Sequence, residues 1–280
     1  NLGQIFREEG EFKKATDFFK KAINLKSDYL IAYNNLINIY INNNSFDEAA
    51  NLLKKCREIF PEDFNILVNY GCVLKELGRY KDAEIYLKKS INLNPNLAIS
   101  YINLAAVQKD LKKLSEAEKN ILKAINLNPK SSLALNNFGN ILKEKGSLDK
   151  AEKKYRSAIN FNKDFYLAYN NLGNLFFTKG DLLNAEKFTQ KAIEINPKFE
   201  LAFVNLAIIK EELNKIDEAE SLYQKAIKIN ENYLYAHVSL WSFYEKTNNL
   251  EKLKNQLNLI KDENSLKYEL LLFKSRISYR

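Results

Sequence analysis

The side chains that most often carry out catalysis are scarce in this sequence. The single histidine, His237, falls in a column of large packing residues, and no other histidine can serve as the base of a Ser/His/Asp triad. Cys56 belongs to a column of small core residues, and Cys72 has no second cysteine nearby with which to hold a metal ion. A glycine-rich phosphate loop is also missing. We therefore predict a protein that is not an enzyme and binds no cofactor or metal.

Asparagines, in contrast, recur at a regular spacing. One column repeats every 34 residues at Asn35, Asn69, Asn103, Asn137, Asn171 and Asn205. A partial second column contains Asn38, Asn140 and Asn174. An asparagine amide can both donate to and accept from a peptide unit, so a ladder of amides suits an extended polypeptide backbone. We predict these nine residues as a peptide-binding ladder, with helix capping or bridging as the alternative role.

The same period runs through the residues that must position these asparagines. Alanine recurs every 34 residues at Ala15, Ala49, Ala83, Ala117, Ala151, Ala185 and Ala219. A column of glycine or asparagine marks turns at Gly10, Asn44, Gly78, Gly146, Gly180, Asn214 and Asn248. Between these marks, apolar residues at helical spacing predict two helices in each unit. One pair of helices cannot bury its apolar face alone, so neighbouring pairs must stack.

The pattern resembles the tetratricopeptide repeat family. In the unit that starts at residue 166, the matching residues are Tyr169, Leu172, Gly173, Phe176, Ala185, Ala192 and Pro197, whereas Thr189 stands where the family has an aromatic residue. The resemblance implies an all-α solenoid, a right-handed superhelix of about eight repeats whose first helices line the concave surface.

The repeat columns also predict the boundaries of the array, which we place at residues 1–267. The units are a partial repeat at 1–29, full repeats at 30–63, 64–97, 98–131, 132–165, 166–199 and 200–233, and a divergent capping repeat at 234–267. Trp241 and Leu253 make the last unit divergent, because both replace small residues. Residues 268–280 are expected to form a final capping helix or a connector to a further domain.

The asparagine column is similar to that of the tetratricopeptide arm of the O-linked N-acetylglucosamine transferases, in which an asparagine ladder holds polypeptide substrates. The resemblance implies a non-catalytic scaffold that binds a protein or peptide segment in its concave groove. A second interpretation is that the chain is the substrate-recruiting arm of a larger modifying enzyme, such as a glycosyltransferase, whose catalytic domain is absent here.

Charge raises a third interpretation, an RNA-binding helical repeat. The net charge is +8, and lysines recur at Lys21, Lys55, Lys89, Lys123, Lys191 and Lys225 on the second helices. That helix faces outward in the family, so we interpret the column as a solvated face. Acidic residues recur on the first helices, where the concave surface is expected, at Glu8, Glu76, Asp110, Glu144 and Glu212. Their negative charge argues against phosphate binding on that surface. We expect protein partners and no nucleic acid.

The sequence also bears on location. It contains no run of apolar residues long enough to cross a membrane. Two cysteines without a disulfide pattern favour a reducing compartment. We expect a cytoplasmic protein whose native N-terminus precedes residue 1, because the chain lacks methionine and begins within a repeat. The sequence does not indicate an oligomeric state.

Overall fold

The computed structural model describes residues 2–259, and throughout this range the regular structure is α-helical. The sixteen helices of these residues follow one another in sequential order, as the all-α repeat prediction requires. They are α1 (Leu2–Glu8), α2 (Phe12–Leu25), α3 (Leu30–Asn42), α4 (Phe46–Ile59), α5 (Phe64–Glu76), α6 (Tyr80–Leu93), α7 (Ala98–Asp110), α8 (Leu114–Leu127), α9 (Ser132–Glu144), α10 (Leu148–Phe161), α11 (Tyr166–Thr178), α12 (Leu182–Ile195), α13 (Glu200–Glu212), α14 (Ile216–Ile229), α15 (Leu234–Lys246) and α16 (Leu250–Leu259).

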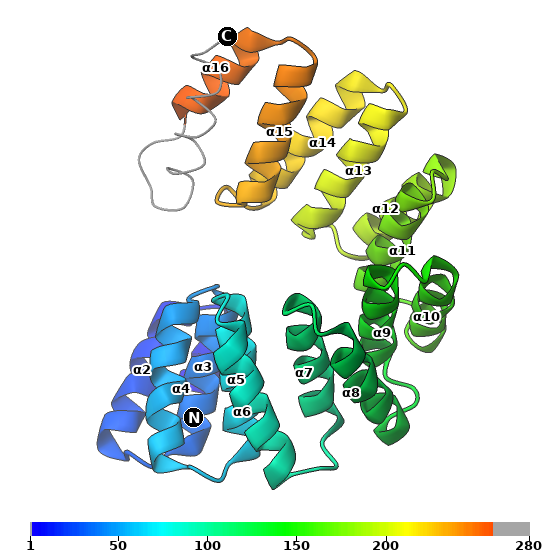
Figure 1. Ribbon diagram of the computed structural model, residues 1–280. Coiled ribbons are helices and arrows are strands. Elements are labelled where there is room, and N and C mark those ends of the chain that lie inside the picture. The colour runs from blue at the N-terminus through cyan, green and yellow to red at the C-terminus, as the bar shows by residue number, and fades with distance from the viewer. Residues whose placement is uncertain (1, 260–280) are drawn as a thin grey trace. The chain divides into compact units, whose positions relative to one another are not determined.

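The described residues divide into two compact units, with the boundary between Gly146 and Ser147. In the first unit α1 packs on α2, α3 on α4, α5 on α6 and α7 on α8, and α9 is the last helix (Figure 1). In the second unit α10 is followed by the pairs α11 with α12, α13 with α14 and α15 with α16. First helices also contact one another, α5 with α7 and α7 with α9 in the first unit and α11 with α13 in the second. Both units are therefore stacks of helical hairpins.

The turn inside each hairpin is made by one residue in the left-handed region. Glycine or asparagine occupies this position in most repeats, with φ between 54° and 78°, as the turn column predicts. A left-handed residue after a helix ends it and redirects the chain, and glycine adopts this conformation without a Cβ clash. Lys112 is the exception, because it has a φ of 61° although it is neither glycine nor asparagine. The sequence column gave no signal at that position.

Small residues bring the two helices of a hairpin close together. A Cβ added to Gly173 on α11 would lie 2.2 Å from Oγ1 of Thr189 and 3.1 Å from the carbonyl oxygen of Ala185, both on α12. Ala185 and Thr189 are fully buried. The close approach of first and second helices, which the glycine and alanine columns predict, is therefore confirmed at this pair.

The last described hairpin replaces small residues with large ones. Trp241 on α15 and Leu253 on α16 are both fully buried, so the divergent positions fill the core. His237 is 7% exposed, lies 6.0 Å from the Trp241 ring, and forms a hydrogen bond between its Nε2 and the Glu231 carbonyl oxygen. This environment agrees with the packing role expected for the single histidine. The helix expected at residues 268–280 lies outside the described residues.

Residues 2–259 contain neither a candidate membrane-spanning helix nor a candidate metal-binding cluster. None of these helices is long and apolar enough to cross a membrane. Histidine, cysteine, aspartate and glutamate side chains in the same range do not gather in any group of three or more that could hold a metal ion.

Candidate peptide-binding pocket

The first helices α5, α7 and α9 enclose a pocket of about 360 Å³ in the first unit. This volume falls within the range of about 300–1,000 Å³ that small-ligand sites occupy. The lining comes from the last two turns of α5, the middle and end of α7, and the middle of α9. The lining residues are Cys72, Lys75, Glu76, Asn103, Ala106, Lys109, Asp110, Asn137, Asn140 and Ile141.

Three of the predicted ladder asparagines meet in this pocket. Asn103 lies on α7, and Asn137 and Asn140 lie on α9. The helices bring them together because Asn103 and Asn137 occupy the same position of successive first helices. Within residues 2–259 neither the Asn103 nor the Asn137 side chain forms a hydrogen bond, whereas Asn140 interacts with another group of the protein. The pocket lining therefore includes two half-buried amides without a hydrogen-bond partner among the described residues.

Charged pairs line the pocket beside the amides. Nζ of Lys75 lies 2.8 Å from Oε1 of Glu76, and Nζ of Lys109 lies 2.8 Å from Oδ1 of Asp110. Burial by itself lowers the pKa of Lys75, but the hydrogen bond and charge of Glu76 outweigh it and raise the pKa above its ordinary value. The lysine therefore stays charged at neutral pH. The helices α5 and α7 therefore each contribute one positive and one negative charge to the wall of the pocket.

Cys72 is half-buried in the same pocket. Burial raises the pKa of its thiol to about 11, and the charge of Glu76 adds to this increase while Lys75 opposes it. A thiol with this pKa is protonated at neutral pH, and the thiol is a much weaker nucleophile than the thiolate. Cys72 therefore contributes a small, weakly polar surface to the pocket.

At the two ends of the predicted ladder, the asparagine side chains form hydrogen bonds with other groups of the protein. Nη1 of Arg7 donates to Oδ1 of Asn35 at 2.6 Å, and Nδ2 of Asn35 donates to the Ile31 carbonyl oxygen at 2.9 Å. In the second unit, Nδ2 of Asn205 donates to Oδ1 of Asn170 at 2.9 Å, and Asn170 is only 3% exposed. Asn35 and Asn205 thus connect neighbouring first helices.

The remaining predicted residues lie outside the pocket lining. Asn38 is exposed on α3, and Asn69 is half-buried on α5. Asn171 and Asn174 are half-buried on α11 in the second unit, and each interacts with another group of the protein. Of the nine predicted asparagines, the structure therefore brings only Asn103, Asn137 and Asn140 together in the pocket.

Two lysines that line the pocket, Lys75 and Lys109, were not predicted from the sequence as site residues. Lys75 and Lys109 are 34 residues apart, so the period that identified the asparagines would have identified them too. Lys143 continues this column on α9 but is not a lining residue of the pocket. Burial lowers the pKa of Lys143, and Glu144 offsets only part of this effect. The acids Glu76 and Asp110, which the sequence suggested would make the inner surface negative, each lie next to one of these lysines. The pocket wall carries both charges, and it is not simply acidic.

Family models match segments along most of the chain. A model described as "TPR repeat" matches residues 139–180, and models described as "Tetratricopeptide repeat" match residues 6–67, 64–97, 98–131, 120–153, 166–199 and 202–233. The chain belongs to the tetratricopeptide repeat family. The matched models describe repeats and no catalytic domain, and tetratricopeptide arrays generally mediate protein–protein interaction.

Solved structures of tetratricopeptide proteins share the fold. A tetratricopeptide repeat protein from Parabacteroides merdae has a TM-score of 0.71 at 19% identity, with 85% of this chain and 94% of that chain covered. The APC/C hetero-tetramer Cut9–Hcn1 gives a TM-score of 0.68 at 16% identity, and the match covers 96% of this chain. This chain spans about half of that structure's chain, 54%.

A curated relative shows similarity over a shorter segment. The peroxisomal targeting signal receptor of Candida albicans is 31% identical over 86 residues, which are 31% of this chain. The segment spans only 14% of the receptor's length.

Proposed function

We propose that this tetratricopeptide array binds an extended segment of a partner protein in the pocket formed by α5, α7 and α9. One observation carries the proposal: Asn103 and Asn137, 34 residues apart, line the same pocket with side chains that form no hydrogen bond within the described residues. Similarity to a protein named as a targeting signal receptor supports a protein segment as the ligand.

The amides would recognise the backbone of the bound segment. An asparagine side chain matches a peptide unit, because it offers both an N–H donor and a carbonyl acceptor. Each such hydrogen bond contributes about 0.5–1.5 kcal/mol net, whereas micromolar affinity requires about 8.2 kcal/mol. The pocket amides alone therefore give weak binding, and side chains of the segment must add to it.

The charged pairs supply those additional contacts. The Lys75 and Glu76 side chains are 31% and 48% exposed, and an exposed ion pair contributes about 0–1 kcal/mol to stability. A charged side chain of the bound segment can therefore replace one partner of the pair at little cost. Binding should weaken as salt concentration rises, because dissolved ions screen exposed charges and the Debye length, about 10 Å at 0.1 M salt, shortens further.

A photo-crosslinking experiment tests the proposal. A photoreactive amino acid replaces Ala106, which lines the pocket, and in a control it replaces the exposed Asn126 on α8. After irradiation in a nuclease-treated cell lysate, crosslinked peptides are identified by mass spectrometry. We expect protein segments to crosslink from position 106 and to be lost in the Asn103→Ala/Asn137→Ala background.

A second control separates amide loss at the pocket from amide loss in general. Asn92→Ala/Asn126→Ala removes two exposed asparagines that are also 34 residues apart but lie on the second helices α6 and α8. Crosslinking from position 106 should persist in this variant. Equal crosslinking from positions 106 and 126, or full retention in Asn103→Ala/Asn137→Ala, would show that the pocket is not the binding site.

A further inference from the structure

A second, unassigned surface lies on the second helices of the first unit, α2, α4 and α6. The groove between α2 and α4 encloses about 570 Å³, and Tyr33, Leu36 and Tyr40 of α3 contribute to its lining. Ile23 of α2 and Leu52 of α4 are apolar residues of its walls. Tyr33 and Leu36 are buried, so this part of the groove is apolar and fixed in place by the core.

The next repeat carries a second groove, between α4 and α6, that encloses about 640 Å³. Arg57, Tyr86 and Leu93 are among its lining residues. The guanidinium carbon of Arg57 lies 4.7 Å from the centre of the Tyr86 ring, and Arg57 donates a hydrogen bond to the Tyr86 hydroxyl. Two consecutive grooves of similar size thus lie along the same side of the first unit.

The charges that line these grooves are mostly positive. Lys20, Lys55, Arg57 and Lys89 line one groove or the other, and Glu48 is their single carboxylate. Within residues 2–259 none of the three lysines takes part in an ion pair. Four cations against one carboxylate favour a ligand with negative charge.

Exposed aliphatic side chains follow the lysines along this face. Leu25 is 89% exposed, Ile59 is 39% exposed and Leu93 is 46% exposed, and the three residues end α2, α4 and α6. Each lies four residues after a lysine, and therefore on the same helix face. The pairs are Lys21 with Leu25, Lys55 with Ile59 and Lys89 with Leu93. The surface therefore alternates cationic and apolar groups at the repeat spacing.

The aromatic rings argue against a nucleic acid as the ligand. Single-stranded nucleic acids bind through bases that stack on exposed aromatic faces. Tyr33 is only 4% exposed, and Arg57 and Lys89 already lie over the Tyr86 ring at 4.7 Å and 5.5 Å. A row of exposed aliphatic side chains likewise matches apolar side chains better than phosphates.

We infer that the second-helix face of the first unit binds an acidic segment of a partner protein, whose apolar side chains enter the two grooves. Carboxylates beside these apolar side chains pair with Lys20, Lys55 and Lys89. This surface is separate from the pocket between α5, α7 and α9, because the two share no lining residue. The array can therefore hold one segment on its first helices and another on its second helices.

The test uses a random peptide library displayed on phage and the whole chain as bait. Lys55→Glu/Lys89→Glu reverses two exposed charges beside the grooves. The matched control is Lys123→Glu/Lys225→Glu, which changes the same repeat column and the net charge equally, on α8 and α14. Leu52→Trp fills the α2–α4 groove without changing charge. Circular dichroism confirms that each variant is folded.

We expect selected peptides to combine aspartate or glutamate with leucine, isoleucine or an aromatic residue, and to bind Asn103→Ala/Asn137→Ala as well as the wild type. Their affinity should fall by at least about tenfold in Lys55→Glu/Lys89→Glu, because two attractive contacts become repulsive. It should fall in Leu52→Trp and stay within about twofold in the control. Peptides without acidic enrichment, or equal losses in test and control, would overturn the inference. So would a single-stranded oligonucleotide that displaces the peptides.

Discussion

Oε2 of Glu84 accepts a hydrogen bond from Nζ of Lys113 at 2.7 Å, although the two residues belong to successive hairpins. Glu84 is 6% exposed and lies on α6, whereas Lys113 precedes α8. Lys88 and Gln108 also donate to its Oε1, at 2.8 Å and 3.2 Å. One carboxylate therefore connects two neighbouring repeats.

This contact recurs at the repeat period. Glutamates stand 34 residues apart at Glu84, Glu118, Glu152, Glu186 and Glu220. Each pairs with a lysine of the following hairpin, and the partners are Lys113, Lys145, Lys179, Lys210 and Lys252. We call this column the glutamate ladder. It adds a directional, ionic contact to the apolar stacking of the repeats.

The first prediction concerns Glu84, the buried member of the glutamate ladder. Burial alone would raise the pKa of Glu84, but hydrogen bonds from Lys113, Lys88 and Gln108 outweigh it and lower the pKa to about 2. Glu84→Gln should lower the free energy of unfolding by about 1.5–3 kcal/mol at neutral pH, the range for hydrogen bonds to charged groups. Urea denaturation followed by circular dichroism measures this change.

The difference in unfolding free energy between the wild type and Glu84→Gln should also depend on pH, in a direction that the lowered pKa determines. A pKa lowered on folding stabilises the folded state above the ordinary pKa of 4.5, and this stability is lost as pH falls from 4.5 toward 2. The stability difference between wild type and Glu84→Gln should therefore shrink over that interval. A constant difference would mean that the carboxylate charge is not what Glu84 contributes.

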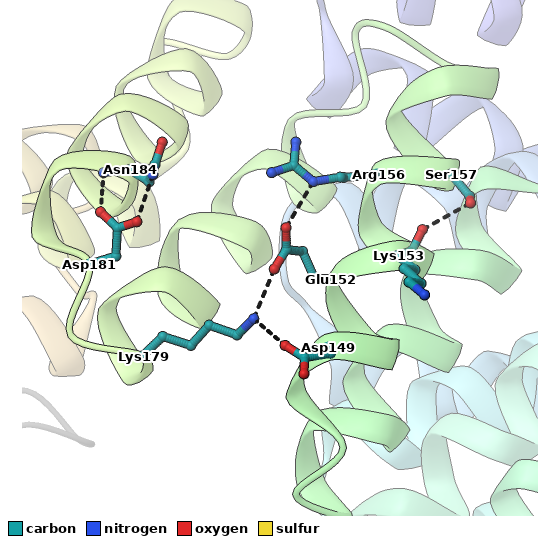
Figure 2. Close-up of polar contacts among 8 residues, drawn as sticks. All are labelled: Asp149, Glu152, Lys153, Arg156, Ser157, Lys179, Asp181 and Asn184. Atoms are coloured by element: carbon teal, nitrogen blue, oxygen red, sulfur yellow. Dashed lines mark hydrogen bonds and ion pairs between the residues drawn. The ribbon is translucent and has the colours of Figure 1, made fainter.

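The second prediction compares two carboxylates that share one lysine. Nζ of Lys179 lies 2.7 Å from Oδ1 of Asp149 and 2.8 Å from Oε2 of Glu152. Figure 2 shows the lysine pointing toward both carboxylates. The Glu152 side chain is 23% exposed and also accepts from Nε of Arg156, whereas Asp149 is 91% exposed. Glu152→Gln should lower stability by up to about 1 kcal/mol, as for a surface ion pair.

Asp149→Asn should lower the urea midpoint less than Glu152→Gln does, because water already solvates most of this carboxylate. Added sodium chloride should reduce the effect of Glu152→Gln, because salt screens surface charges. If Asp149→Asn lowers stability as much as Glu152→Gln does, burial of the carboxylate does not determine how much each ion pair contributes to stability.

The third prediction concerns the close approach of α11 and α12. A Cβ at position 173 would lie 2.2 Å from Oγ1 and 3.0 Å from the backbone nitrogen of Thr189. Because a backbone atom cannot rotate away, Gly173→Ala should destabilise the second unit by about 1–3 kcal/mol, the usual cost of overpacking. Thermal unfolding measures the change, and Gly173→Ala/Thr189→Ala, which removes Oγ1, should remain destabilised because the contact with the backbone nitrogen persists. Recovery in the double variant would place the clash in the side chain alone.

These examples show which features the sequence can and cannot predict. The repeat period depends on residue types in columns, so hairpins, turns and tight glycine contacts could be predicted without coordinates. The pairing of a particular side chain depends on neighbours in other columns. Asn35 accepts a hydrogen bond from Arg7, and Asn205 donates one to Asn170, whereas the Asn103 side chain forms none within residues 2–259. A column of identical asparagines therefore contains amides that differ in their hydrogen bonding within the described residues.

The turn column shows a second limit. Lys112 adopts a φ of 61°, in the left-handed region that costs a residue with a Cβ roughly 1–2 kcal/mol. The repeat geometry imposes this conformation, because the turns at Gly78 and Gly146 adopt it in the neighbouring hairpins. Tertiary packing overrides the local preference of lysine here, and residue type alone could not reveal it.

The last prediction separates the two kinds of asparagine. Asn205→Ala removes the donor to Oδ1 of Asn170, a side chain only 3% exposed, so that a buried acceptor loses its partner. This loss should lower the free energy of unfolding by about 1–3 kcal/mol. Asn103→Ala should change stability by less than about 0.5 kcal/mol, because this amide forms no hydrogen bond within the described residues. Urea denaturation of both variants, beside crosslinking from position 106, gives the comparison. If Asn103→Ala proves as destabilising as Asn205→Ala, its amide is structural, and the pocket loses the feature on which peptide binding was proposed.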